Sequence, residues 1–153
     1  MKIEDIEEKI KKYELYIEED LKNDLKKVDD TLRLKNSMYQ EWEEVENMSK
    51  TIQEFNEKDR DMLLKLELGD GVLVQGEVTN FNDVFVDIGL GHILKMEPVE
   101  AIKYAGIRKN ILKKEVDHNR KLAVEIKTRI KFTLLAISEL QSTILPPEQE
   151  KKR

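Results

Sequence analysis

The chain has 153 residues, of which 39% are charged and only 6% are aromatic, and its formal net charge is −5. An average globular protein is roughly 25% charged. A chain this polar cannot fill a thick layered core, so we expect a single domain of elongated helices with narrow apolar seams. The acidic balance argues against a dedicated nucleic-acid binder, which needs a basic face.

Membrane and secretory classes also find little support. No apolar run approaches the length of about 18 residues that a transmembrane helix needs. The N-terminal stretch MKIEDIEEKI is acidic and has no apolar core of the kind found in signal peptides. With no cysteine in the chain, disulfides are excluded and nothing argues for secretion.

Residues 1–62 carry seam residues at steps of three and four, which predicts one long coiled-coil helix. The seam runs through Ile3, Ile6, Ile10, Tyr13, Ile17, Leu21, Leu25, Val28, Leu32, Lys35, Tyr39, Trp42, Val45, Met48, Ile52, Phe55, Asp59 and Met62. Its spacing holds one stutter, at Ile17–Leu25, and one stammer, at Tyr39–Met48, which coiled coils absorb by local unwinding and overwinding. We expect Lys35, and Asn119 of the C-terminal helix, to fix the register, because a polar seam residue penalises slipped pairings.

In residues 63–96 the apolar period shortens to about two, which predicts β-strands. Gly69-Asp70-Gly71 and Gly89-Leu90-Gly91 are signals for tight turns, so we expect two β-hairpins. Two short hairpins bury little surface and leave their strand edges unpaired, so partner chains are needed to complete the sheet. The predicted assembly interface consists of Val72, Val74, Val78, Val84, Val86 and Ile88.

Residues 97–145 predict a second coiled-coil helix, and 146–153 a tail. Its seam alternates three and four through Ile102, Ala105, Lys109, Leu112, Val116, Asn119, Ala123, Ile126, Ile130, Thr133, Ile137, Leu140 and Ile144. Pro98 suits a first helical position, and Pro146-Pro147 ends the helix. A short sheet between the two helices requires antiparallel pairing. Aligned outward from the sheet, the first helix overhangs by about ten residues.

The run VFVDIGLGHILK, followed at once by PVEAIKYAGIRKNIL, resembles the α-class subunits of the prefoldin family. KYELYIEEDLKNDLKKV (12–28) and IKTRIKFTLLAISELQ (126–141) resemble the ubiquitously expressed transcript (UXT) branch of that family. The resemblance spans nearly the whole chain. It implies a mostly α fold with a small β part, an antiparallel coiled-coil hairpin joined by two β-hairpins. Glu97 departs from the family, which often has Ser or Thr there as the helix cap.

This resemblance implies a non-enzymatic subunit of a prefoldin or prefoldin-like hetero-oligomer that holds unfolded proteins without ATP. Its partners would be β-class prefoldin subunits, a URI-type α-class scaffold and non-native clients. The candidate client contacts at the helix tips are Ile3, Ile6, Ile10, Ile144 and Leu145. The alternative is an adaptor or transcription cofactor that binds specific partners through the coiled coil. We expect it in the cytoplasm and also in the nucleus.

Patterns for catalysis or cofactors are weak. Gly-x-Gly occurs twice, but neither instance opens a G-x-G-x-x-G fingerprint between a strand and a helix. His92 and His118 belong to different predicted elements and have no cysteine beside them, so a metal site is not expected. No serine, histidine and acid arrangement can be drawn around His118. We expect no enzyme activity, no cofactor, no direct nucleic-acid binding and no membrane contact.

Overall fold

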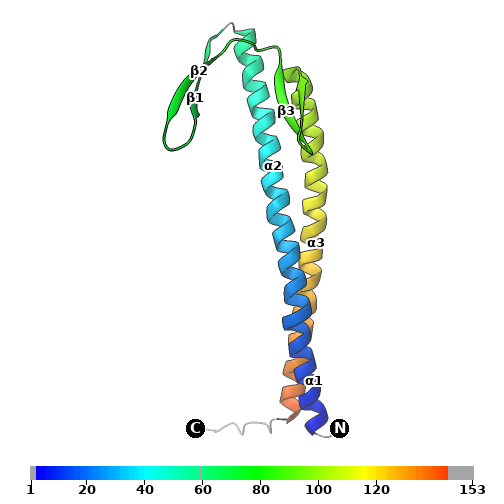
Figure 1. The fold of residues 1–153 in the computed structure, drawn as a ribbon. Helices are drawn as coiled ribbons and strands as arrows, with labels where there is room; N and C mark the ends of the chain where they lie inside the picture. The colour runs from blue at the N-terminus through cyan, green and yellow to red at the C-terminus, as the bar shows by residue number, and fades with distance from the viewer. Residues whose placement is uncertain (1–2, 59, 145–153) are drawn as a thin grey trace, which may run out of the picture. The chain divides into compact units, whose positions relative to one another are not determined.

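The computed structural model describes residues 3–58 and 60–144, in the order helix, two β-hairpins, helix (Figure 1). The helical elements are α1 (Ile3–Leu15), η1 (Tyr16–Leu21), α2 (Lys22–Glu57) and α3 (Pro98–Ile144). The strands are β1 (Met62–Glu67), β2 (Leu73–Val78), β3 (Val84–Gly89) and β4 (His92–Met96). Two antiparallel sheets of two strands each result, β1 with β2 and β3 with β4. The predicted fold of two long antiparallel helices with two β-hairpins between them is confirmed.

The chain divides into two compact units. Unit 1 comprises Met1–Lys35 and Glu115–Arg153, and unit 2 comprises Asn36–Lys114. In unit 1, α1, η1 and the start of α2 pair with the C-terminal part of α3. Unit 2 holds the rest of α2, both hairpins and the start of α3. The predicted last residue of the N-terminal helix, Met62, instead begins β1, where it pairs with Val78.

Aliphatic side chains from α1, η1 and α3 form the core of unit 1. Ile17, Leu21 and Ile137 are buried together, and smaller contributions come from Ile10, Ile126 and Ile130. The segment η1 is a π-helical turn, in which the N–H of Lys22 donates to the carbonyl oxygen of Ile17 five residues earlier. This wider turn takes up the irregular spacing of the predicted stutter, so that Ile17 and Leu21 both reach the core.

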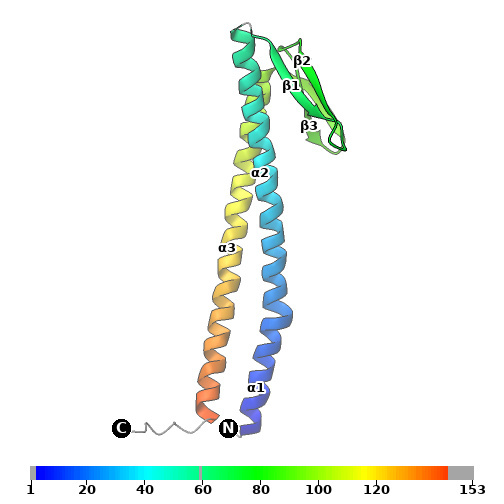
Figure 2. The ribbon, with the colours of Figure 1, turned by 90° about the vertical axis from the view of Figure 1, so that its left-hand side faces the viewer.

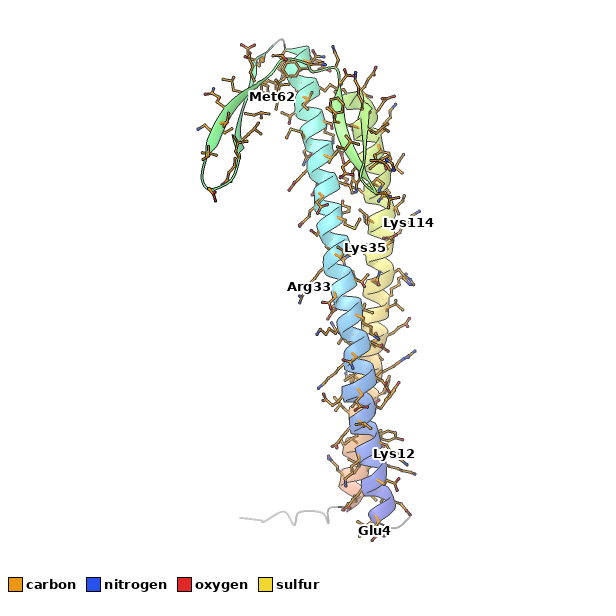
Figure 3. The ribbon with its side chains drawn as sticks, viewed as in Figure 1. Glu4, Lys12, Arg33, Lys35, Met62 and Lys114 are labelled. Atoms are coloured by element: carbon orange, nitrogen blue, oxygen red, sulfur yellow. The ribbon has the colours of Figure 1, made fainter. Side chains whose placement is uncertain are left out.

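The first turn of α1 lies level with the last turn of α3 (Figure 2). Across the helix pair, Lys35 Nζ lies 2.7 Å from Glu115 Oε2 (Figure 3), in agreement with the register role predicted for Lys35. Ile6 is only 4% exposed. The predicted overhang is therefore wrong for Ile6. Counting outward from the sheet ignored the side chains that interlock along the seam, and these set the register.

The predicted seam of α3 is confirmed along its whole length. Every predicted seam position from Ile102 to Ile144 is buried or half-buried. Asn119 donates from Nδ2 to the carbonyl oxygen of Glu115, at 2.8 Å in its own helix. Its amide is thereby satisfied within its own helix and not across the seam, as the register role predicted for Asn119 would require. Lys35 and Lys109 are seam residues that form ion pairs with the facing helix, to Glu115 and Glu46.

The core of unit 2 forms where the β3–β4 hairpin packs against α2 and α3. Its buried residues are Trp42, Val86, Met96, Ala101, Ala105 and Leu112. The Trp42 and Tyr104 rings meet edge to face with centroids 5.3 Å apart. The guanidinium of Arg108 lies 5.6 Å from the centroid of the Trp42 ring, a cation–π contact. Trp42 is thus held on several sides by residues of α3 and the hairpin.

The predicted stammer in α2 is not what the structure shows. After Trp42 and Val45 the buried seam passes to Ser49, whereas Met48 is exposed. The Ser49 hydroxyl donates to the carbonyl oxygen of Val45 at 2.7 Å, which satisfies it in the apolar surroundings. Hydropathy favoured Met48 over its neighbour, but a regular step of four from Val45 places Ser49 on the buried side.

Both predicted turns are confirmed by backbone conformation. Asp70 and Leu90 have φ of 50° and 55°, and the glycines on either side of each are also at positive φ. Gly69 and Gly89, at φ of 104° and 100°, occupy a region that a Cβ atom disfavours. The two Gly-x-Gly sequences therefore form the tight turns that join the strands of each hairpin.

Helix α3 begins at Pro98, as predicted. Its cap comes from an unexpected residue, because the Glu100 carboxylate accepts the backbone N–H of Glu97 at 3.1 Å. This is the glutamate half of a capping box, which stabilises the helix start without Ser or Thr at position 97. Among the described residues, no helix has the length and apolar character needed to span a membrane.

An ion-pair network joins α2 and α3 inside unit 2. Glu46 lies 2.5 Å from Lys109 Nζ on the facing helix and 2.5 Å from Lys50 Nζ on its own. Hydrogen bonds from Lys109 and then from Lys50 hold the pKa of the half-buried Glu46 below its usual 4.5. The hydrogen bond to Glu46 in turn raises the pKa of Lys109 above its ordinary value.

We expect Glu46→Gln to lower the free energy of unfolding by about 1 kcal/mol at neutral pH. A carboxyl whose pKa is depressed by folding stabilises above its unfolded pKa, near 4.5, and loses that contribution as pH falls through the folded value. In urea titrations, the free energy of unfolding of the wild type should therefore fall as the pH is lowered below that value. The free energy of unfolding of Glu46→Gln should fall less over the same pH range. Glu44→Gln, at an exposed position two residues away, is the control and should match the wild type.

Candidate functional site

The β1–β2 hairpin presents an exposed apolar face. In the strand register Leu66 stands opposite Val74, and the two side chains are 52% and 41% exposed. Leu68 and Val72 extend the same kind of surface beside the turn and are also exposed. The opposite face carries the polar and charged residues Lys65, Glu67, Gln75 and Glu77 together with Leu63 and Leu73. Apolar area of this kind on a two-stranded sheet marks a binding surface.

The β3–β4 hairpin uses its corresponding face differently. Val86 is 6% exposed and lies in the core of unit 2, with Val84 and Ile88 packed against that core. The predicted interface residues are thus separated: Val72 and Val74 are exposed and Val78 is half-buried, while Val84, Val86 and Ile88 contact their own chain. Alternation identifies the residues that share a face, but it does not say what covers that face.

The outer face of β3–β4 carries apolar residues that the sequence reading left out. Phe85 is 72% exposed, and Ile93 and Leu90 are exposed as well. The signal was present in the run from Val84 to Ile88, because β3 has an apolar residue on both of its faces. An exposed aromatic side chain on a strand face is apolar area of the kind that binding surfaces use.

Both sheets also have unpaired edges. Each sheet has two strands, so within the described part of the chain every strand has one edge without a neighbouring strand. Backbone N–H and C=O groups along such an edge are available to pair with another strand. The β1–β2 hairpin extends away from the end of α2, where its edges are accessible (Figure 1). The hairpins can therefore join other chains through both main-chain and side-chain contacts.

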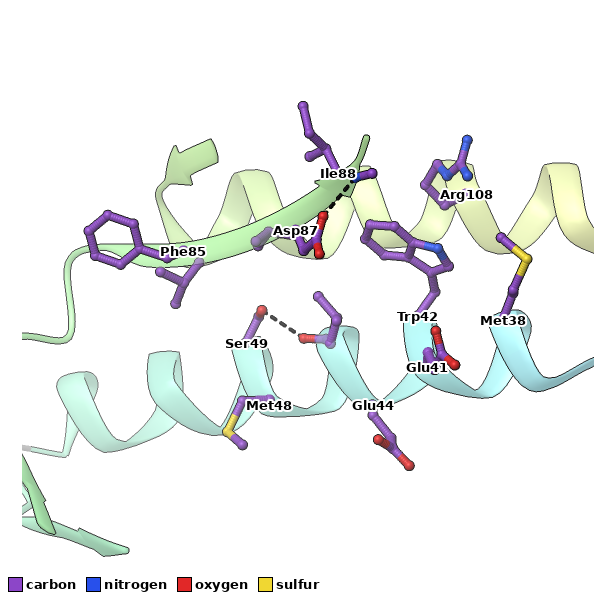
Figure 4. Close-up of a pocket in the computed structure, with 14 residues that line it drawn as sticks. Met38, Glu41, Trp42, Glu44, Met48, Ser49, Phe85, Asp87, Ile88 and Arg108 are labelled. Carbon is purple, nitrogen blue, oxygen red and sulfur yellow. Dashed lines mark hydrogen bonds between the residues drawn. The ribbon is translucent and has the colours of Figure 1, made fainter. Parts of the chain in front are cut away.

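A groove of about 590 Å³ runs between α2 and β3 (Figure 4). Trp42 and Ile88 form its apolar wall, and Arg108 closes one side. Asp87 is held at its rim by accepting the N–H of Gly89 at 2.8 Å. The groove is bordered by β3 of the β3–β4 hairpin, and the described residues that line it include no cluster of catalytic groups. It suits an apolar side chain rather than a reacting substrate.

The structure separates the residues predicted to contact clients. Ile3 is exposed, Ile6 is buried, and Ile10 packs against the core of unit 1. Ile144 is half-buried, and Leu145 lies outside the described residues. Of the tip residues that the structure describes, Ile3 therefore offers the most accessible apolar surface.

The histidines lie on separate elements. His92 begins β4 and His118 lies on α3, and both are exposed. Within residues 3–58 and 60–144, no group of three or more histidine, aspartate or glutamate residues is arranged to hold a metal ion.

Comparisons with known proteins agree on one family. A family model described as "Prefoldin subunit" matches residues 33–143. The chain is 32% identical to "Protein UXT homolog" of Dictyostelium discoideum over 86% of this chain and 81% of that protein. It is 27% identical to "Protein UXT homolog" of Nematostella vectensis over 90% and 86%, and 26% identical to "Protein UXT" of Homo sapiens over 93% and 89%. A solved structure of filamentous PFD from Methanocaldococcus jannaschii matches with a TM-score of 0.43 and 16% identity, over 89% of this chain and 98% of that one.

Prefoldin subunits are non-enzymatic chaperone subunits that assemble with one another. The matched segment contains both hairpins, most of α2 and nearly all of α3. It covers well over half of the sequence, and the resemblance carried by the hairpin and α3 motifs points the same way. This chain belongs to the prefoldin subunit family and, within it, is similar to the UXT proteins.

Proposed function

We propose that this chain assembles through its hairpins with β-class prefoldin subunits into a co-chaperone that holds non-native proteins without ATP. The observation that carries the proposal is the exposed Leu66–Val74 face of β1–β2, beside unpaired strand edges. An isolated two-stranded hairpin is marginally stable in water, so a surface of this kind gains most from being covered. Membership of the prefoldin family supports other prefoldin subunits as the chains that cover it.

Expression alone and together with β-class prefoldin subunits tests this proposal. Alone, the chain should form concentration-dependent oligomers, because the exposed apolar hairpin faces of different copies would associate with each other. With β-class subunits it should co-purify as one discrete complex, which native mass spectrometry would resolve. A stable monomer from micromolar to millimolar concentration in analytical ultracentrifugation would contradict the proposal.

Client contact at the helix tip is a second part of the proposal, and Ile3 is its best-placed residue. In the assembled complex, Ile3→Ser should leave stability within about 0.5 kcal/mol and reduce suppression of client aggregation, because exposed apolar area is lost. Ile6→Ser is the matched comparison and should cost about 2 kcal/mol, since that side chain is buried. Equal aggregation suppression by Ile3→Ser and wild type would place the client surface elsewhere.

The adaptor or transcription-cofactor role is the second candidate, and one observation favours it. Helix α3 exposes large apolar residues on its outer side in unit 1, Phe132 and Leu135 among them, which an independent partner could bind. A URI-type scaffold is the partner we propose for a prefoldin-like complex, and the cytoplasm and nucleus are the compartments we propose. An adaptor should retain one or a few partners in affinity capture, whereas a chaperone should suppress aggregation of many unrelated proteins.

A further inference from the structure

The outer face of α3 in unit 1 carries large apolar side chains that no described residue covers. Phe132 and Leu135 are 67% and 53% exposed, and Val124 and Leu134 are also exposed. The inner face of the same stretch is already occupied, because Ile126, Ile130 and Ile137 pack in the core of unit 1. Helix α3 therefore has two apolar sides here, although pairing with α1 and α2 requires only one.

This face is basic, in contrast to the chain as a whole. Residues 120–135 hold five cations and one carboxylate, within a chain whose formal net charge is −5. Four of these cations, Lys121, Lys127, Arg129 and Lys131, have no carboxylate within ion-pair distance among the described residues. Unpaired cations beside exposed apolar side chains give the face a definite charge preference.

The spacing of the outer face favours a helix as its occupant. Val124, Thr128, Lys131 and Leu135 follow steps of four, three and four, which place them on one side of α3. This is the spacing with which one helix packs along another. The acidic α1 of a second copy is a poor occupant, because its apolar residues Ile6 and Ile10 are already used within their own unit.

We propose that the outer face of α3, from Val124 to Leu135, binds an amphipathic helix of a partner protein whose apolar stripe is flanked by Asp or Glu. Phe132 and Leu135 would bury the apolar stripe of the bound helix. Lys127 and Lys131 would favour helices with acidic residues beside that stripe. This deepens the proposed function by giving the chemistry of one bound class of protein. It rests on that function only in requiring that the helices bind other proteins, and it does not require assembly through the hairpins.

The test uses a labelled, designed helical peptide in which leucines recur at steps of four and three and are flanked by glutamates. Its binding is measured by fluorescence anisotropy, by titration with the full chain alone and with the full chain in its co-purified complex. We expect binding that weakens as salt rises and that falls at least tenfold for Lys127→Glu/Lys131→Glu. A peptide with lysine in place of glutamate should bind that variant better than it binds the wild type. Lys113→Glu/Lys114→Glu reverses two exposed cations elsewhere on α3 and should leave binding unchanged (Figure 3).

A second variant, Phe132→Ser/Leu135→Ser, keeps the charges and should also weaken binding, with helicity checked by circular dichroism. The proposal would be overturned if the wild type bound a glutamine-flanked peptide as tightly as the glutamate-flanked one. It would also be overturned if Lys127→Glu/Lys131→Glu and Phe132→Ser/Leu135→Ser both bound the glutamate-flanked peptide as tightly as the wild type does. It would also fail if the peptide does not bind. If Lys127→Glu/Lys131→Glu then dissolves a dimer in sedimentation, the face belongs to a second copy. Co-elution with β-class subunits reports separately on the proposed function, so the two failures are distinguishable.

Discussion

Val86→Asp should lower the free energy of unfolding by about 3–5 kcal/mol, because it removes a buried aliphatic side chain and leaves a carboxylate without a partner in its place. Val86 belongs to the same core as Trp42, Met96 and Ala101. Trp42 is the single tryptophan of the chain, so its fluorescence reports directly on this region. Urea unfolding followed by Trp42 fluorescence and by far-ultraviolet circular dichroism would measure the loss.

Phe85→Asp is the matched control, one residue away on the same strand. Phe85 points to the outer face and is largely exposed, so the change should cost less than about 1 kcal/mol. A comparable loss of stability in both variants would mean that the outer face of β3 is covered within the chain. Wild-type stability of Val86→Asp would show that β3–β4 does not pack on the helices in solution.

Val74→Lys should strongly weaken assembly with partner subunits while leaving the subunit folded. Val74 lies on the exposed apolar face of β1–β2, opposite Leu66, so a lysine there is tolerated in the isolated chain. Once partner subunits cover that face, the ammonium group would be buried without a counter-charge. We expect affinity for β-class prefoldin subunits to fall by at least about 100-fold, or roughly 2.7 kcal/mol.

Leu73→Lys provides the comparison for this second variant. Leu73 is exposed on the other face of β2, where it pairs with Glu67, and a lysine can form an ion pair there. The Leu73→Lys chain should co-elute with β-class subunits in size-exclusion chromatography as the wild type does. Co-elution of both variants would show that the Leu66–Val74 face takes no part in assembly.

Local patterns predicted the elements well, since each depends on residues close together in the chain. The alternation of three and four from Ile102 to Ile144 gave the buried side of α3 throughout. Gly-x-Gly gave both hairpin turns, and Pro98 gave the start of α3. The irregular spacing near Ile17 marked the position of the π-helical turn. Backbone sterics and side-chain periodicity decide these features, and both can be read without tertiary contacts.

Alignment and coverage were less predictable. The overhang failed at Ile6, and the seam near the hairpin passes through Ser49 instead of Met48. The proposed interface separated into an exposed part at Val74 and a buried part at Val86. The outer face of α3 was not singled out, because its basic and apolar residues stand out only once the inner seam is known to be occupied.

By itself the sequence determined the order of elements, the faces of the helices and strands, the turns and the family of this chain. The tertiary structure decided which of those faces are covered. Val74 and Val86 each lie on the apolar face of a hairpin, yet Val74 is exposed, whereas Val86 packs on the helices beside Trp42 and the small residues Ala101 and Ala105. Coverage depends on long-range packing between segments far apart in the chain, and periodicity within one segment carries no information about it.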